Sequence, residues 1–267
     1  MEYIEYFFSN LNETYIYLLL IAAMIFSMWA QFNVQTTFSK YSKVKNMAGM
    51  TGFEAARMIL DRNGLTNVRV ERVSGNLTDH YDPKANVIRL SEGVFSSTSA
   101  AAVGVAAHEA GHAVQHAVGY GPIKVRTAII PVCNIGSYLA WPLIILGIIT
   151  TIPELSFIGV ILFSAATVFQ LVTLPCEFNA SSRALAALRE SGRMGKDDLS
   201  AAKKTLTAAA LTYLAALAVS ILNLLRIIAM LNRNNRDRKT RGTDFDSKTS
   251  SPFVGEFVHR QRKIYKP

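Results

Sequence analysis

The sequence predicts a polytopic α-helical membrane protein with about four membrane helices and a small α+β domain. Half of its 267 residues are hydrophobic and only 18% are charged, which is too apolar for an average soluble protein. The apolar residues are concentrated in four uncharged tracts, whereas residues 40–126, between the first two tracts, look like a folded soluble segment. Internal repeats, which would indicate a repeat fold, are absent.

The four uncharged tracts are each close to the roughly 20 residues that cross a bilayer. They cover residues 14–38, 127–152, 155–175 and 206–225. The first tract follows Glu2, Glu5 and Glu13 rather than a basic segment, so we expect a signal anchor and not a cleaved signal peptide. Pro131 and Pro142 interrupt the second tract.

The soluble segment is predicted to contain a helix, three short strands and a second helix. Thr51 followed by Glu54 is typical of a capping box, and Gly64 ends the first helix. A Ser/Thr cluster at 97–99 can cap the second helix. Turn residues separate the three strands, which we expect to form a meander. The strands cover residues 68–73, 77–82 and 86–91.

These features divide the chain into consecutive parts. They are an N-terminal segment with the first membrane helix (1–39), a cytoplasmic α+β domain (40–126), a membrane hairpin (127–175), a helix with a basic loop (176–205), a fourth membrane helix (206–231) and a basic tail (232–267). The tail is so polar that we expect it to be disordered. Cys133 and Cys176 do not suffice for a disulfide framework, and we expect both to be reduced packing residues.

Basic residues indicate the orientation in the membrane. Lys and Arg are absent from residues 1–39, and eleven then fall between Lys40 and Arg126. The positive-inside rule therefore places residues 40–126 on the cytoplasmic side of the cell membrane, although the basic residues after the fourth tract disagree with helix parity. In either orientation the hairpin returns Glu177 to the side of residues 40–126. The net charge of +9 indicates anionic lipid rather than nucleic acid as the partner of the basic loops.

The candidate site begins with the stretch "AAHEAGHAVQH". His108 and His112 lie four residues apart, which on a helix places both imidazoles on one face about 6 Å apart along the axis. This is the H-E-x-x-H pattern, in which two histidines bind one zinc and Glu109 accepts a proton from an activated water. A histidine pair at this spacing can also be incidental. However, burying such polar groups unpaired among Ala, Gly and Val costs several kcal/mol, which favours a metal.

A third ligand has to come from another part of the chain. Glu177 follows the third tract on the same side as the histidines, although a Glu near a helix start can also serve the helix dipole alone. Cys176 is the rival ligand, but on a helix it points about 100° away from Glu177. His116 continues the series yet lies about 12 Å along the helix from His108, too far to share the metal, so we expect it to pack beside the site.

Several motifs together resemble one family. "LTDHYDP", "RLS", "AAHEAGHAVQHAVGY" and "LPCEFNASSRAL" occur in the order found in the YugP-like family of membrane zinc metallopeptidases, which is similar to the HtpX-type membrane proteases. The resemblance covers most of residues 1–231. It implies a zincin-like metalloprotease domain of the gluzincin type, in which His108, His112 and Glu177 bind one zinc per chain and Glu109 is the general base.

The resemblance also implies further site residues. HtpX-type relatives have an Asp that orients a ligand His where this chain has Ser181, and Asn179 and Arg183 are near enough to replace it. His80 and Tyr81 are candidates for stabilising the transition state, or else structural turn residues. An extended substrate peptide is expected on an edge strand. That strand would contain Val87, Ile88, Arg89, Leu90 and Ser91.

The sequence therefore favours a zinc-dependent endopeptidase that cleaves membrane or membrane-associated proteins by a zinc-activated water with Glu109 as the base. An intramembrane site-2-type protease is disfavoured, because the four tracts lack Asp. The remaining alternative is a non-proteolytic scaffold or adaptor with a structural zinc. A structural site closes all four metal positions and has no use for a carboxylate such as Glu109 beside its ligand.

Overall fold

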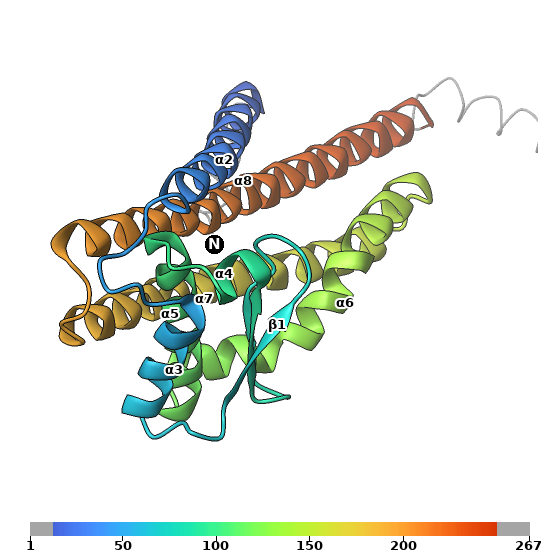
Figure 1. Cartoon of the computed structure of the whole chain (residues 1–267). Helices are drawn as coiled ribbons and strands as arrows, with labels where there is room; N and C mark the ends of the chain where they lie inside the picture. Colours follow the sequence, from blue (N-terminus) through green and yellow to red (C-terminus); the bar gives the residue numbers. More distant parts are fainter. Residues whose placement is uncertain (1–12, 250–267) are drawn as a thin grey trace, which may run out of the picture. The chain divides into compact units, whose positions relative to one another are not determined.

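The computed structural model describes residues 13–249 and places a small α+β domain among long helices (Figure 1). Along the chain the elements are α2 (Glu13–Tyr41), α3 (Gly52–Arg62), β1 (Arg69–Val73), β2 (His80–Asp82), β3 (Val87–Ser91), α4 (Glu92–Phe95), α5 (Ala100–Ala117), α6 (Gly121–Ile149), α7 (Pro153–Glu190) and α8 (Lys196–Thr249). Helices α2, α6, α7 and α8 are long and apolar enough to cross a membrane. The predicted fold class is confirmed.

Two of the membrane helices are longer than the apolar tracts that predicted them. Helix α7 continues through Pro175 and Glu177, so the helix expected to begin near Glu177 is the second part of α7. The polar helix simply extends the apolar one, because adding residues to an existing helix avoids the cost of a new nucleus. Pro131 and Pro142 likewise lie inside α6 without ending it. Such prolines are tolerated in membrane helices where other groups satisfy the freed backbone.

Helix α8 also extends further than expected. It continues to Thr249, so the prediction of disorder from residue 232 is wrong over 232–249, where propagation from the apolar part of the helix is favourable. Residues 250–267 lie outside the described part of the chain. Residues 18–224 form one compact unit, which contains the site considered below. Residues 13–17 and 225–249 belong to a second unit and are the first turn of α2 and the end of α8.

The sheet is not the meander that the sequence suggested. Its strand order is β1-β3-β2, with β1 parallel and β2 antiparallel to β3. The expectation that residues 87–91 form an edge strand is therefore wrong. The reason lies in the side chains of β3, since Val87, Ile88 and Leu90 are all fully buried. A strand that is largely buried on both faces is stable at the centre of a sheet, and the short polar β2 lies at one edge.

Helix α5 is the centre of the soluble core. It contacts α3, the sheet and α7 (Figure 1), and its alanines from Ala100 to Ala113 are almost completely buried. The Ser99 hydroxyl caps the helix by accepting a hydrogen bond from the backbone N–H of Ala102, and Gly119 follows its end with a φ of +64°. The capping box of Thr51 and Glu54 begins α3 as expected. This packing holds α5 rigidly beside α7.

Candidate metal centre

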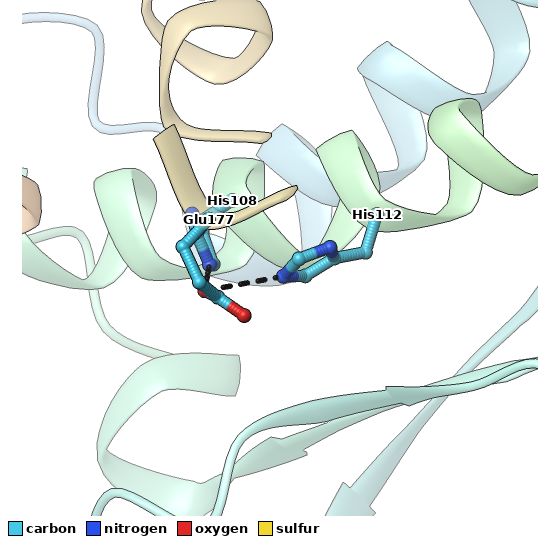
Figure 2. Close-up of side chains that lie close together, drawn as sticks. All are labelled: His108, His112 and Glu177. Atoms are coloured by element: carbon cyan, nitrogen blue, oxygen red, sulfur yellow. Dashed lines mark hydrogen bonds and ion pairs between the residues drawn. The ribbon is translucent and has the colours of Figure 1, made fainter. Parts of the chain in front are cut away.

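Two imidazoles on α5 face the carboxylate of Glu177 on α7. Figure 2 shows the three side chains pointing toward one another. The Nε2 atoms of His108 and His112 lie 3.2 Å and 3.5 Å from the same carboxylate oxygen, Oε2 of Glu177. The potential ligand atoms of the three residues all lie within 4.8 Å of one another. Residues separated by about 70 positions in the sequence thus converge on one point.

A glycine inside the motif allows α7 to come this close. A Cβ atom at Gly111 would lie only 2.6 Å from the carbonyl oxygen of Ala180. No larger residue fits between the two helices at this point without moving them apart. Ala180 follows Glu177 by three residues, about one helical turn, so the close contact fixes the carboxylate opposite the histidines. The Gly in this motif therefore has a packing role that the spacing of the ligands alone does not reveal.

Gln115, which the sequence analysis missed, holds the ring of His112. Its amide Nε2 donates hydrogen bonds to the backbone carbonyl of Cys176 and to Oδ1 of Asn179, so its Oε1 faces His112. That oxygen lies 3.0 Å from Nδ1 of His112 and can only accept, so Nδ1 carries the proton. The lone pair of Nε2 is then free to bind a metal. Gln115 is completely buried between the two helices.

The ring of His108 has a different outer partner. Its Nδ1 lies 3.1 Å from the hydroxyl of Ser181, the residue at the position expected to orient a ligand. Asn179 and Arg183, which were suggested to replace the orienting Asp of HtpX-type relatives, contact other residues. Asn179 binds the amide of Gln115, and the Nε of Arg183 donates to Asn179 over 2.8 Å. These two residues therefore support His112 through Gln115, whereas Ser181 is the one of the three that contacts His108.

Two further side chains lie beside Glu177. Nη1 of Arg126, on α6, lies 3.3 Å from Oε1, while Oε2 faces the histidines. Tyr213, on α8, lines the same cavity as Glu177. One carboxylate oxygen thus faces the histidines, and the other faces the guanidinium group of Arg126. Arg126 and Tyr213 gave no motif in the sequence, because they come from helices that only the tertiary structure brings together.

Glu109 lies beside the three converging residues at the wall of an open cavity. The cavity has a volume of about 370 Å³ and is lined by Glu109, both histidines and Glu177. Asp79 shares this wall, and its carboxylate accepts hydrogen bonds from the backbone and hydroxyl of Ser91. Burial raises the pKa of Asp79, and the nearby charge of Glu109 raises it further against the effect of the Ser91 hydrogen bonds.

His80, Tyr81 and His116 also line this cavity. The Tyr81 ring packs against His116 with 5.5 Å between centroids, and its hydroxyl donates to Asn86 over 3.3 Å. Nδ1 of His80 lies 2.8 Å from the carbonyl oxygen of Thr78. Burial lowers the pKa of His116 and raises that of Tyr81, so both side chains favour their neutral forms.

The side chains at this point suit a zinc ion. Two imidazole nitrogens and one carboxylate oxygen are the ligands of many catalytic zinc sites, which keep a further position for water or substrate. Burial lowers the pKa of His112, but the hydrogen bond to Glu177 and the charge of Glu109 outweigh burial and raise this pKa. The surroundings therefore favour a positive charge at this point. Metal binding would displace the additional proton of His112. The Cys176 thiol instead donates to the Val172 carbonyl over 3.4 Å.

Four helices suited to a membrane and a cluster of two histidines and a glutamate define a class of membrane proteins with a candidate zinc centre. Residues 16–232 match the family described as "Putative neutral zinc metallopeptidase", and the chain belongs to this family. It is also similar to "Putative membrane protease YugP" of Bacillus subtilis (strain 168), with 50% identity over 219 residues, 82% of this chain and 97% of that protein. No solved structure matches.

These comparisons confirm the family resemblance that the sequence motifs indicated. The protein is a membrane protein of the zinc protease class, and a protease acts on peptide substrates.

Proposed function

We propose that the protein is a gluzincin-type endopeptidase that cleaves membrane or membrane-associated proteins. The observation that carries this proposal is the position of Glu109. Its carboxylate lines the same cavity as His108, His112 and Glu177. A structural zinc site is closed and needs no such base, whereas this cavity of about 370 Å³ has room for water and substrate. The scaffold hypothesis does not account for either feature.

In this mechanism His108, His112 and Glu177 hold one zinc per chain. When bound, the ion would lower the pKa of a water molecule and polarise the carbonyl of the substrate. Glu109 accepts the proton of the attacking water and passes it to the leaving amine. The neighbouring Asp79 is instead held by Ser91, whose backbone N–H and hydroxyl donate to its carboxylate.

The surrounding residues keep the ligands in place. Gln115 fixes the protonated nitrogen of His112, and Ser181 contacts the corresponding nitrogen of His108. Arg126 holds the free oxygen of Glu177. Such outer contacts orient ligands and usually affect metal affinity or activity by about 10–100-fold.

Substrate placement follows from the sheet order. With β3 at the centre, β1 and β2 are the edge strands, and the residues of β2, His80–Asp82, line the cavity. We assign the outer edge of β2 as the place where an extended peptide pairs. Tyr213 lies beside Glu109 at the cavity wall and is our candidate for stabilising the oxyanion. His80 and Tyr81 line the same cavity but bond to Thr78 and Asn86.

The location of the candidate metal centre supports membrane-associated substrates. Glu177 belongs to α7 and Arg126 to α6, and both helices are long and apolar enough to cross a membrane. The catalytic groups therefore lie where these helices meet the soluble domain. The distribution of basic residues favours the cytoplasmic side of the cell membrane.

The test is a comparison of purified full-length protein with its Glu109→Gln variant. We expect both to contain about one zinc per chain. The variant should lose peptide hydrolysis by about 10²–10⁴-fold, because a general base has been removed. Elemental analysis and cleavage of a peptide substrate give the two measurements. Full hydrolysis by Glu109→Gln would exclude the proposed mechanism, and absence of zinc that cannot be restored would favour the scaffold.

A further inference from the structure

Two cavities meet at the proposed metal centre. The larger one, described above, has charged and polar groups of the β2 region and Arg126 on one side, and apolar residues of α6, among them Ile123, Ile130 and Pro131, on another. The smaller one has a volume of about 190 Å³. Both cavities share the same group of residues at their junction. These are Asp79, His108, Glu109, Glu177 and Tyr213.

The walls of the smaller cavity are mostly apolar. Away from the junction its only polar lining residue is Ser181, which is turned to His108. The apolar lining residues come from the loop before β2 and from three helices. They are Leu77, Val34 of α2, Val105 of α5, and Leu206, Ala209 and Ala210 of α8. A charged group placed among these side chains would lose its hydration without a partner, so the cavity selects apolar groups.

The size of the smaller cavity fits one side chain. Pockets for whole drug-sized ligands measure about 300–1,000 Å³, well above the 190 Å³ found here. Ala209 and Ala210 create this space, because larger residues at these positions of α8 would project into it. The cavity opens directly beside Glu109, so its occupant has to be close to the bond that is cleaved.

The helices that line the smaller cavity indicate the type of substrate. Val34 belongs to α2 and Leu206–Ala210 to α8, and both helices are long and apolar enough to cross a membrane. Val34 precedes the end of α2 by about two turns, and Lys40 lies in the last turn. The cavity therefore lies near one end of the apolar part of these helices. A polypeptide that leaves the bilayer beside them brings its last apolar residues to this depth.

We propose that the smaller cavity is a specificity subsite for one apolar side chain next to the cleaved bond, in a substrate segment that emerges from a membrane helix. This inference rests on the proposed endopeptidase function. The polar continuation of the substrate then lies on the β2 side of the larger cavity, where His80, Asp82 and Lys84 are among the lining residues. A boundary between apolar and polar sequence, which occurs where a membrane helix ends, matches the apolar smaller cavity and this side of the larger one.

The experiment uses the full-length protein in detergent and an equimolar synthetic library of peptides with an apolar-to-polar boundary, with cleavage sites mapped by mass spectrometry. We expect Leu, Ile, Met or Phe at one position beside the cut to exceed Asp or Lys by about 10–200-fold. Ala210→Leu fills the cavity and should shift this preference toward Ala and Gly by about tenfold. Leu206→Ala enlarges it and should shift the preference toward larger aromatic residues.

The matched control is Ala216→Leu, an equal change at an exposed position of the same helix, which should leave the preference unchanged. Zinc content and thermal unfolding show that each variant is folded. If Ala210→Leu and Leu206→Ala cleave with the wild-type preference, the subsite is excluded while the endopeptidase function stands. If one variant does not fold, the other still decides. Cleavage that persists in Glu109→Gln, or no cleavage of any library peptide, would instead overturn the proposed function together with the subsite.

Discussion

Helix α7 makes two close contacts that differ in what they bury. Toward its C-terminal end it packs on α5, where a Cβ at Gly111 would lie 2.6 Å from the Ala180 carbonyl oxygen. In the membrane hairpin it packs on α6, where a Cβ at Gly159 would lie 2.7 Å from the Ala140 carbonyl oxygen. Glycine thus gives both contacts the same short separation between helices.

The surroundings of the two contacts are very different. Around Gly159 the buried neighbours are Ala140 and Ile144, with the hydroxyl of Ser156 donating to a backbone carbonyl. Around Gly111 the helices bury Gln115 and Glu177, two groups that are costly to remove from water. Close packing needs only small residues, so the polar groups at the contact around Gly111 require another explanation. A metal centre supplies it, and the following variants test this difference.

The largest effect is expected from Glu177→Ala. Removing the carboxylate leaves two histidines, which do not retain zinc as well as three ligands do. Elemental analysis should show a fall from about one zinc per chain to a small fraction after dialysis. Unchanged zinc content would move the third ligand to another group, such as Cys176.

The two glycines should respond differently to alanine. Gly111→Ala should separate α5 from α7, displace Glu177 and weaken zinc binding by about tenfold or more. Gly159→Ala should lower the thermal stability of the hairpin by about 1–3 kcal/mol without changing zinc affinity. A competitive zinc titration and a thermal unfolding curve measure the two effects. Gly93→Ala is the neutral control, because no atom lies within 4 Å of its added Cβ. Equal zinc affinity in the Gly111 and Gly159 variants would remove the proposed distinction.

Gln115→Met keeps the size of the side chain but removes the oxygen that accepts from His112. Zinc binding should weaken by about 10–100-fold, the usual effect of losing an outer partner of a ligand. Gln115→Glu keeps an oxygen for His112 and should bind zinc more tightly than Gln115→Met. If both variants bind zinc equally, Gln115 contributes packing only, and the fixed protonation of His112 is not important.

The smallest effect is expected from Ser181→Ala, at most about tenfold in zinc affinity, because a neutral hydroxyl orients His108 less strongly than a carboxylate would. Ser181→Asp should restore or exceed wild-type affinity, since a carboxylate can accept from Nδ1 of His108. The same zinc titration compares the three proteins. Weaker binding by Ser181→Asp than by Ser181→Ala would show that this position does not orient the ligand.

The sequence alone determined the features that depend on local pattern. Uncharged tracts predicted four membrane helices, because a bilayer requires a continuous apolar length. The capping box predicted the start of α3, and the spacing of His108 and His112 placed both rings on one face of α5. These features are set by residues within a few turns of one another, which is why pattern suffices.

The tertiary structure decided what depends on contacts between distant segments. Strand order could not be read from short strands, since the burial of β3 on both faces is a property of the folded sheet. Helix ends were missed because propagation carries α7 through Pro175 and α8 beyond residue 232. The contacts of Gln115 and Arg126 with the candidate ligands likewise join different helices and follow no spacing rule. Only packing, through small residues such as Gly111, decides which side chains meet.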